Sequence, residues 1–131
     1  MTTLLEKKEA IREVIDRFSA LEIDVAEQAE LFTPDAHVEL YGADGSLMME
    51  FDGREKLIEV FGGGMSGVKT AYHMNGQQVI TIDGDTATDI HYCQASLIRE
   101  EDGRDVLTRH SIRYTDTLVN RGGRWLISRR E

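Results

Sequence analysis

The chain contains 131 residues, which is the usual size of one folded domain with its own hydrophobic core. Its 15 Lys and Arg residues against 24 Asp and Glu residues give a formal net charge of −9, which argues against the strong basic field that nucleic-acid binding needs. A hydrophobic content of 40% with 30% charged residues is typical of a folded protein. The sequence therefore predicts one domain over residues 1–131, without a nucleic-acid partner.

Cysteine usage and apolar stretches indicate the compartment. The chain has one cysteine, Cys93, which cannot form an internal disulfide or a cysteine metal cluster. Residues 1–6 lack the basic and apolar segments of a secretory signal, and no apolar run approaches the roughly 18 residues of a membrane span. We therefore expect a cytoplasmic protein without a membrane partner.

The start of the chain predicts two helices. Apolar residues recur at intervals of three, four and seven over residues 4–25, which is typical of an amphipathic helix. Residues 3–6 fit a capping box at its start, and residues 24–27 fit the start of a second, short helix. That helix is expected to end at residues 33–35, where a proline restricts the residue before it.

A hairpin and a third helix are expected next. Residues 37–41 alternate as a strand does, residues 42–45 form a turn, and residues 47–51 can return as the partner strand. A helix is expected after Asp52, ending in the three glycines at 62–64.

From Val68 onward the apolar period changes from 3.6 to two. The expected strands cover residues 68–82, 85–100, 105–120 and 124–130, separated by glycine-containing turns. Helices at the front and an antiparallel meander at the back predict an α+β domain. In it, three N-terminal helices lie across one face of a strongly curved sheet of five or six strands.

Two short motifs do not support a cofactor. Gly62, Gly64 and Gly67 match a dinucleotide-binding spacing, but they follow a helix and precede a strand, the reverse of the required order. Residues 83–89 begin like a calcium loop but lack its later glycine and glutamate. The four histidines show no ligand spacing, so we expect neither a cofactor nor a metal.

Three segments carry a family resemblance. They are ELFTPDAHVEL at residues 30–40, AYHMNGQQVITIDGDTA at 71–87 and RYTDTLVNRGGRWLISRR at 113–130. With the order of elements, they resemble the SnoaL-like branch of the nuclear transport factor 2-like superfamily. The resemblance implies a cone-shaped, barrel-like fold with a pocket between sheet and first helix, commonly assembled as a homodimer through the sheet. The superfamily includes isomerases, dehydratases, cyclases and non-catalytic binders, so the fold does not assign the function.

Glu22 is the first catalytic candidate. It follows Ile15 by seven residues and Phe18 by four, so it continues the apolar stripe and is expected to point inward. A carboxyl group in an apolar cleft is suited to proton transfer, but the helix could instead end here and direct Glu22 to water. Scytalone dehydratase and the bile-acid dehydratases carry an acidic residue at a similar place, although their adjacent tyrosine is not matched at residues 17–21.

His73 is the second catalytic candidate, and its spacing from Asp83 resembles the strand that bears the catalytic histidine of those dehydratases. Strict alternation puts His73 on the side opposite Ile80, away from a pocket. A β-bulge at Gly76 would switch the parity and bring His73 to the isoleucine face. There it could form an acid–base pair with Glu22; the alternative is a structural histidine bonded to a backbone carbonyl.

The next two strands present a face suited to a pocket wall. Its side chains are small, apolar or titratable: Ala87, Asp89, His91, Cys93, Ala95, Leu97, His110, Ile112, Tyr114, Asp116 and Leu118. His91, His110 and Tyr114 are candidates for substrate binding, although such groups could equally form a closed structural network. On the opposite face Tyr92 is a candidate anchor for a dimer interface. The second catalytic histidine of scytalone dehydratase has its counterpart near Leu97, where this chain has no histidine.

Further pocket candidates come from other elements. Tyr41 could donate a hydrogen bond to a substrate oxygen or could simply complete the core. Phe18 belongs to the apolar stripe of the first helix, and Met74 is expected as packing or adaptable pocket lining. His37, beside Asp35, is expected on the surface.

These residues predict a cofactor-independent lyase or isomerase, dehydratase- or cyclase-like, acting on a small, apolar, oxygenated molecule. Elimination of water next to a carbonyl needs a base, an acid and a donor to an oxygen, and these residues offer all three. The alternative is a non-catalytic small-ligand-binding or accessory protein. Convergent Glu22 and His73 would favour the enzyme, and a pocket filled by Met and Phe side chains would favour the binder.

Overall fold

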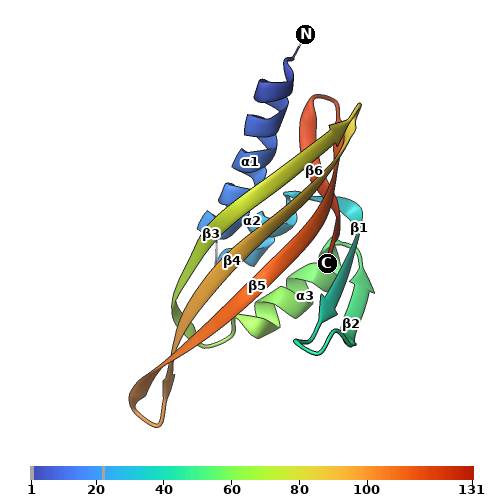
Figure 1. Ribbon diagram of the computed structural model, residues 1–131. Coiled ribbons are helices and arrows are strands. Elements are labelled where there is room, and N and C mark those ends of the chain that lie inside the picture. Colours follow the sequence, from blue (N-terminus) through green and yellow to red (C-terminus); the bar gives the residue numbers. More distant parts are fainter. Residues whose placement is uncertain (1, 22) are drawn as a thin grey trace.

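Figure 1 shows the computed structural model, which describes residues 2–21 and 23–131. In these residues the helices α1 (Leu4–Leu21), α2 (Val25–Ala29) and α3 (Arg54–Gly64) lie on one side of a six-stranded sheet. The strands are β1 (Phe32–Tyr41), β2 (Leu47–Asp52), β3 (Val68–Asp83), β4 (Thr86–Glu101), β5 (Arg104–Arg121) and β6 (Arg124–Arg130). The predicted α+β class with helices on a curved sheet is confirmed.

The sheet has the strand order β2-β1-β6-β5-β4-β3. The predicted antiparallel meander is correct from β3 to β6, but β1 runs parallel to β6. The hairpin of β4 and β5 projects beyond the helices (Figure 1). Within the described chain, no helix combines the length and the apolar character that a membrane crossing requires.

The two expected helix starts are present, but the second helix is shorter than predicted. Thr3 Oγ1 accepts the Glu6 N–H at 3.1 Å, and Asp24 Oδ1 accepts the Glu27 N–H at 3.2 Å. α1 ends at Leu21 and α2 ends at Ala29, while residues 33–35 belong to β1. The reason is long-range pairing: the backbone enters the sheet where the Ile127 N–H donates to the Leu31 carbonyl at 2.9 Å.

The core lies between the helices and the inner face of the sheet. Its most deeply buried apolar side chains are Ile11, Ile15, Phe32, Val38, Leu57, Leu118 and Ile127. Phe18, Phe32 and Phe61 meet edge to face, with ring centroids 5.9–6.5 Å apart. These rings join α1, β1 and α3 at the place where the helices cross the sheet.

A β-bulge in β3 determines which of its residues face inward. Asn75 pairs with Cys93, whereas Gln78 pairs with His91, so one extra residue lies in β3 between the two pairs. The expected bulge at Gly76 is therefore confirmed, and His73 lies on the same inner face as the buried Ile80.

A second bulge, which the sequence analysis did not anticipate, lies in β6. Leu118 pairs with Ile127, but Thr117 pairs with Arg129, so Ser128 is the extra residue. Ile127 and Arg130 are three positions apart and yet both are buried. The bulge thus brings Arg130 opposite Asp116 on the inner face.

We predict that deleting Gln77 destabilises the protein by more than about 2 kcal/mol, because it removes the bulge and turns one half of β3 over. Tyr72 and Met74 would then face the core in place of Ala71 and His73. Urea unfolding followed by circular dichroism measures the change in free energy.

The matched control is Gly76→Ala, which keeps the residue count. A Cβ there would lie 3.6 Å from the Tyr92 carbonyl oxygen, an ordinary contact, so we expect a change below about 1 kcal/mol. Wild-type stability in the deletion variant would contradict the assigned role of the bulge.

Candidate functional site

A pocket of about 910 Å³ opens beside the inner face of the sheet. Its apolar lining comes from helices and strands: Phe18, Leu40, Met49, Val60, Phe61, Met65 and Ile112. Its polar lining includes Gln28, Glu39, Tyr41, His73, His110, Tyr114, Arg130 and Glu131. A largely apolar cavity with a few polar groups is typical of a small-molecule site.

Five of the predicted site residues meet at this pocket, namely Phe18, Tyr41, His73, His110 and Tyr114. The two other predicted substrate-binding residues are not among the described side chains that line it. Met74 is 52% exposed, because it follows His73 in the strand and points to the opposite face. His91 is 2% exposed and buried in the sheet-side core. Glu22 lies outside the described residues.

His73 and His110 lie in one row across the sheet. His73 pairs with Ala95 of β4, and Ala95 pairs with His110 of β5. Two strand spacings separate the backbones of the histidines by roughly 10 Å. Ala95, between them, is buried. The row therefore offers two imidazoles at one wall of the pocket.

Arg130 forms a buried ion pair behind the polar wall. Its Nε donates to Asp116 Oδ1 at 2.8 Å and its Nη2 donates to Asp116 Oδ2 at 2.7 Å. Both residues are at most 1% exposed. Burial alone would lower the pKa of Arg130, but the Asp116 carboxylate outweighs it, so the pKa is raised and the guanidinium stays charged.

Two aromatic rings lie against this guanidinium. Its Cζ lies 4.2 Å from the ring centroid of Phe18 and 4.3 Å from that of Tyr114. The Tyr114 ring stacks on His91 with centroids 4.9 Å apart, and His91 Nδ1 is hydrogen-bonded to Asp89. Burial raises the pKa of Tyr114, so its phenol remains protonated near neutral pH. The inner face thus combines the two expected alternatives: Asp89, His91 and Asp116 form a structural network, and Tyr114 faces the pocket.

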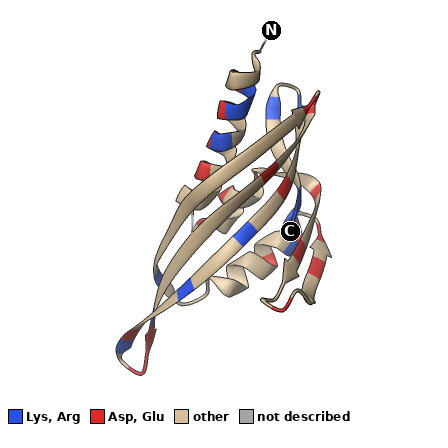
Figure 2. Cartoon of the chain, in the orientation of Figure 1, with Lys and Arg blue, Asp and Glu red and all other residues tan. Residues whose placement is uncertain are grey.

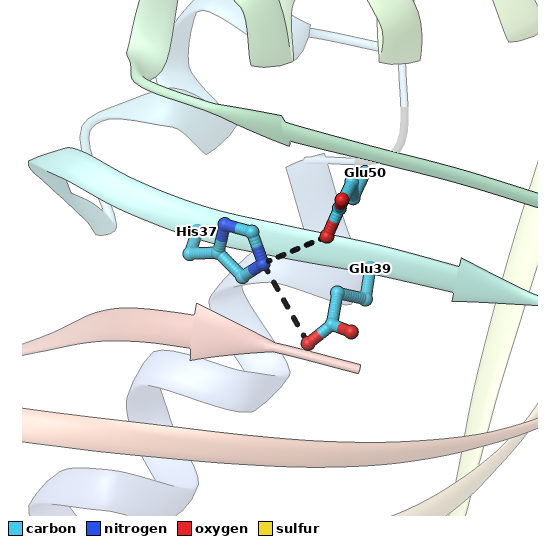
Figure 3. A group of neighbouring side chains, drawn as sticks. All are labelled: His37, Glu39 and Glu50. Carbon is cyan, nitrogen blue, oxygen red and sulfur yellow. Dashed lines mark ion pairs between the residues drawn. The ribbon is translucent and has the colours of Figure 1, made fainter. Parts of the chain in front are cut away.

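A second polar group lies on the β1–β2 hairpin. Figure 3 shows the His37 ring between Glu39 and Glu50, with Nε2 3.6 Å and 3.7 Å from their carboxylates. Asp52 is 2.8 Å from Nδ1, so the expected surface histidine is partly buried among three carboxylates. Tyr41 donates to Glu39 at 2.6 Å, which lowers the pKa of Glu39 and raises that of Tyr41.

Two sets of described side chains could each offer three ligand atoms to a metal: His37, Glu39 and Glu50, and Asp89, His91 and Asp116. In the first set Arg129 already pairs with Glu39. In the second set Arg130 occupies both Asp116 oxygens. One carboxylate in each set, Glu39 or Asp116, is therefore already paired with an arginine, which a metal would have to displace.

Arg130, Gln28 and Glu39 line the pocket but were not predicted from the sequence. Gln28 is buried and donates to the Phe18 carbonyl at 2.9 Å, so it holds α2 against α1. Glu39 and the exposed Arg129 form an ion pair that no spacing rule reveals. Nothing in the sequence separates Arg130 from the exposed Arg124 and Arg129 of the same strand, because the β6 bulge changes the face to which residue 130 points.

Solved structures with the same fold are similar to the chain. A candidate scytalone dehydratase from Novosphingobium aromaticivorans superposes with a TM-score of 0.80 at 22% identity, covering 97% of this chain and 83% of that one. A candidate dehydratase of the nuclear transport factor 2-like family from Streptomyces avermitilis gives 0.79 at 13% identity, covering 94% and 92%.

A nuclear transport factor 2-like protein with a cystatin-like fold, also from Novosphingobium aromaticivorans, gives a TM-score of 0.74 at 26% identity, covering 98% of this chain and 81% of that one. No curated protein matches the chain in sequence. The model of the SnoaL-like domain matches residues 3–131. The chain therefore belongs to the SnoaL-like domain family.

Proposed function

We propose that this protein is a cofactor-independent lyase or isomerase of the dehydratase or cyclase type. The observation that carries the proposal is the bulge in β3, which brings His73 into the lining of an otherwise largely apolar pocket. His110 and Tyr114 line the same pocket. The dehydratase names of two similar structures support this reaction class.

The proposed reaction is the elimination of water next to a carbonyl group. His73 takes the proton from the carbon beside the carbonyl, and Glu22, which follows Leu21 of α1 in sequence, gives a proton to the leaving hydroxyl. Tyr114 donates a hydrogen bond to the carbonyl oxygen as negative charge develops on it, whereas the Tyr41 hydroxyl already donates to Glu39. The products are water and an unsaturated carbonyl compound, so the reaction consumes no nucleotide and no other co-reactant.

The alternative function is non-catalytic binding of a small ligand. Met49, Met65 and Phe61 line the pocket and provide an adaptable apolar surface, which supports binding without turnover. Four polar or titratable groups in the lining, His73, His110, Tyr114 and Arg130, exceed what an apolar ligand needs for retention. We therefore place the enzyme first.

We also propose a homodimer through the outer face of β3 and β4. Exposed apolar side chains gather there: Tyr72, Met74, Val79, Ile90 and Tyr92. Val79 and Ile90 are directly paired across the two strands. The charged residues of β3, Lys69 and Asp83, lie near its ends, so its middle is free of charge (Figure 2). A second copy of this face is the natural partner, because an isologous contact pairs the apolar patch with itself.

The catalytic proposal predicts that His73→Gln lowers kcat/KM by about 10²–10⁴-fold, because glutamine keeps polarity but cannot transfer the proton. A suitable probe is the β-hydroxy ketone formed from benzaldehyde and acetone, whose dehydration product absorbs in the near ultraviolet. Glu22→Gln should show a similar loss, and the double variant should lose little more than either single one, because the pair acts as a unit.

Matched controls are His37→Gln and the exposed Glu13→Gln, which we expect to retain the wild-type rate. Circular dichroism checks that each variant is folded. A folded His73→Gln protein with wild-type turnover would refute the assigned base and transfer the role to His110 or Tyr114.

The dimer proposal predicts a mass of two chains in size-exclusion chromatography with light scattering at micromolar concentration. Tyr92→Lys should give the mass of one chain, because it places a charge in the apolar face. Ile58→Lys, at an exposed apolar position on α3, is the control and should leave the dimer intact. A wild-type monomer would rule out this interface.

A further inference from the structure

One donor of a pocket-lining residue, Arg130, has no hydrogen-bond partner among the described residues. Arg130 lines the pocket, and its Nε and Nη2 both bond to Asp116. The remaining nitrogen, Nη1, is buried and makes no hydrogen bond with any described residue. A buried donor without an acceptor is costly, particularly when it belongs to a charged group, and it calls for a specific partner.

The position of this donor is tightly fixed. The bidentate pair with Asp116 sets the plane of the guanidinium, and the rings of Phe18 and Tyr114 pack against it. The side chain therefore cannot rotate to satisfy Nη1 elsewhere without breaking the ion pair. A donor preorganised in this way favours an acceptor at one location, since little ordering remains to be done on binding.

A second donor lies beside it. The Tyr114 phenol lines the same pocket, its ring is stacked on the guanidinium, and its proton is retained near neutral pH. Phe18, Phe61 and Ile112 supply apolar contacts in the same lining. The arrangement combines one charged donor and one neutral donor with apolar walls.

We propose that Arg130 Nη1, assisted by the Tyr114 hydroxyl, forms a subsite for an acceptor oxygen of the ligand, carried by a carbonyl or carboxylate group. The proposal rests on the pocket being the ligand site and assigns the substrate class: an apolar skeleton with a carbonyl or carboxylate at its inserted end. In the dehydration reaction this subsite would hold the oxygen on which negative charge develops. Arg130 then binds the reacting group, while Asp116 is a positioning residue.

The experiment uses the intact protein and three probes with one skeleton, namely naphthoate, acetonaphthone and ethylnaphthalene. Isothermal titration or intrinsic fluorescence gives their dissociation constants. We expect one or both of the oxygen-bearing probes to bind at least tenfold more tightly than ethylnaphthalene. A preference for naphthoate indicates a carboxylate ligand, and equal binding of naphthoate and acetonaphthone indicates recognition of the carbonyl oxygen.

A variant-free readout accompanies the titration. The side-chain Nη and Cζ resonances of Arg130 should shift on addition of the tighter probe and remain unchanged with ethylnaphthalene.

Arg130→Lys should reduce the preference for the oxygen-bearing probes at least fivefold, because a lysine that stays paired with Asp116 offers no fixed second nitrogen. Arg124→Lys, at an exposed arginine in β6, is the matched control and should keep the preference. Tyr114→Phe should reduce the preference partly.

Equal affinities for the three probes, with unchanged Arg130 resonances, would overturn the proposal and leave Nη1 to an internal water shared with Asp89, whose Oδ1 is also unbonded among the described residues. If Arg130→Lys fails to fold, the resonance shifts and Tyr114→Phe still decide the outcome. Turnover is not measured in this experiment. A protein that binds acetonaphthone through Arg130 but does not dehydrate the β-hydroxy ketone would keep this subsite and refute the proposed reaction alone.

Discussion

The extra residue between Asn75 and Gln78 in β3 and the extra residue Ser128 in β6 bring His73 and Arg130 to the pocket side of the sheet. In a regular strand, residues separated by an odd number of positions face opposite sides of the sheet. His73 and Ile80 are seven apart, and Ile127 and Arg130 are three apart, yet each pair faces inward. The bulges therefore let a strand keep apolar residues in the core at one end and present a polar group to the pocket at the other.

The electrostatics of the inner wall follow from this geometry. Once the β6 bulge directs Arg130 inward, a carboxylate must accompany it, because an isolated charge in this setting would be strongly unfavourable. Asp116 lies directly opposite in β5 and binds two of the guanidinium nitrogens. Phe18 of α1 packs on the same group, so the ion pair also contacts the first helix. Removing Arg130 or Asp116 would therefore disturb both the contact between β5 and β6 and the packing of α1 on the sheet.

Much of the fold was predictable because it depends on local patterns. The helical stripe of α1, the turns between the long strands and the alternation in β4 and β5 each act over a few residues, and the structure agrees with them. The end of α2 and the parallel pairing of β1 with β6 were not predicted, because both depend on contacts between residues about 95 positions apart, such as Leu31 with Ile127. Local capping and proline signals carry no information on such pairing.

A site residue was predictable from the sequence only where the face of the sheet to which it points could be inferred. His73 was recovered because Gly76 suggested an interruption in its strand, although a Cβ at this position meets only ordinary contacts and the bulge does not require glycine. Met74 was expected as packing or adaptable pocket lining, but it follows His73 in the strand, and adjacent residues in a strand face opposite sides. Arg130 was missed because Ser128 gives no comparable signal in β6.

The division between structural and pocket-facing groups also has a physical basis. On β4 and β5 the inward residues Asp89, His91 and Asp116 are almost wholly inaccessible, and each is bonded within the wall. Tyr114 and His110 are on the same face of β5, yet both reach the pocket. The Tyr114 ring contacts both the Arg130 guanidinium and the His91 ring, and Tyr114 also lines the pocket. Tyr114 and Arg130 are thus the two residues of this wall that belong both to the buried network and to the pocket lining.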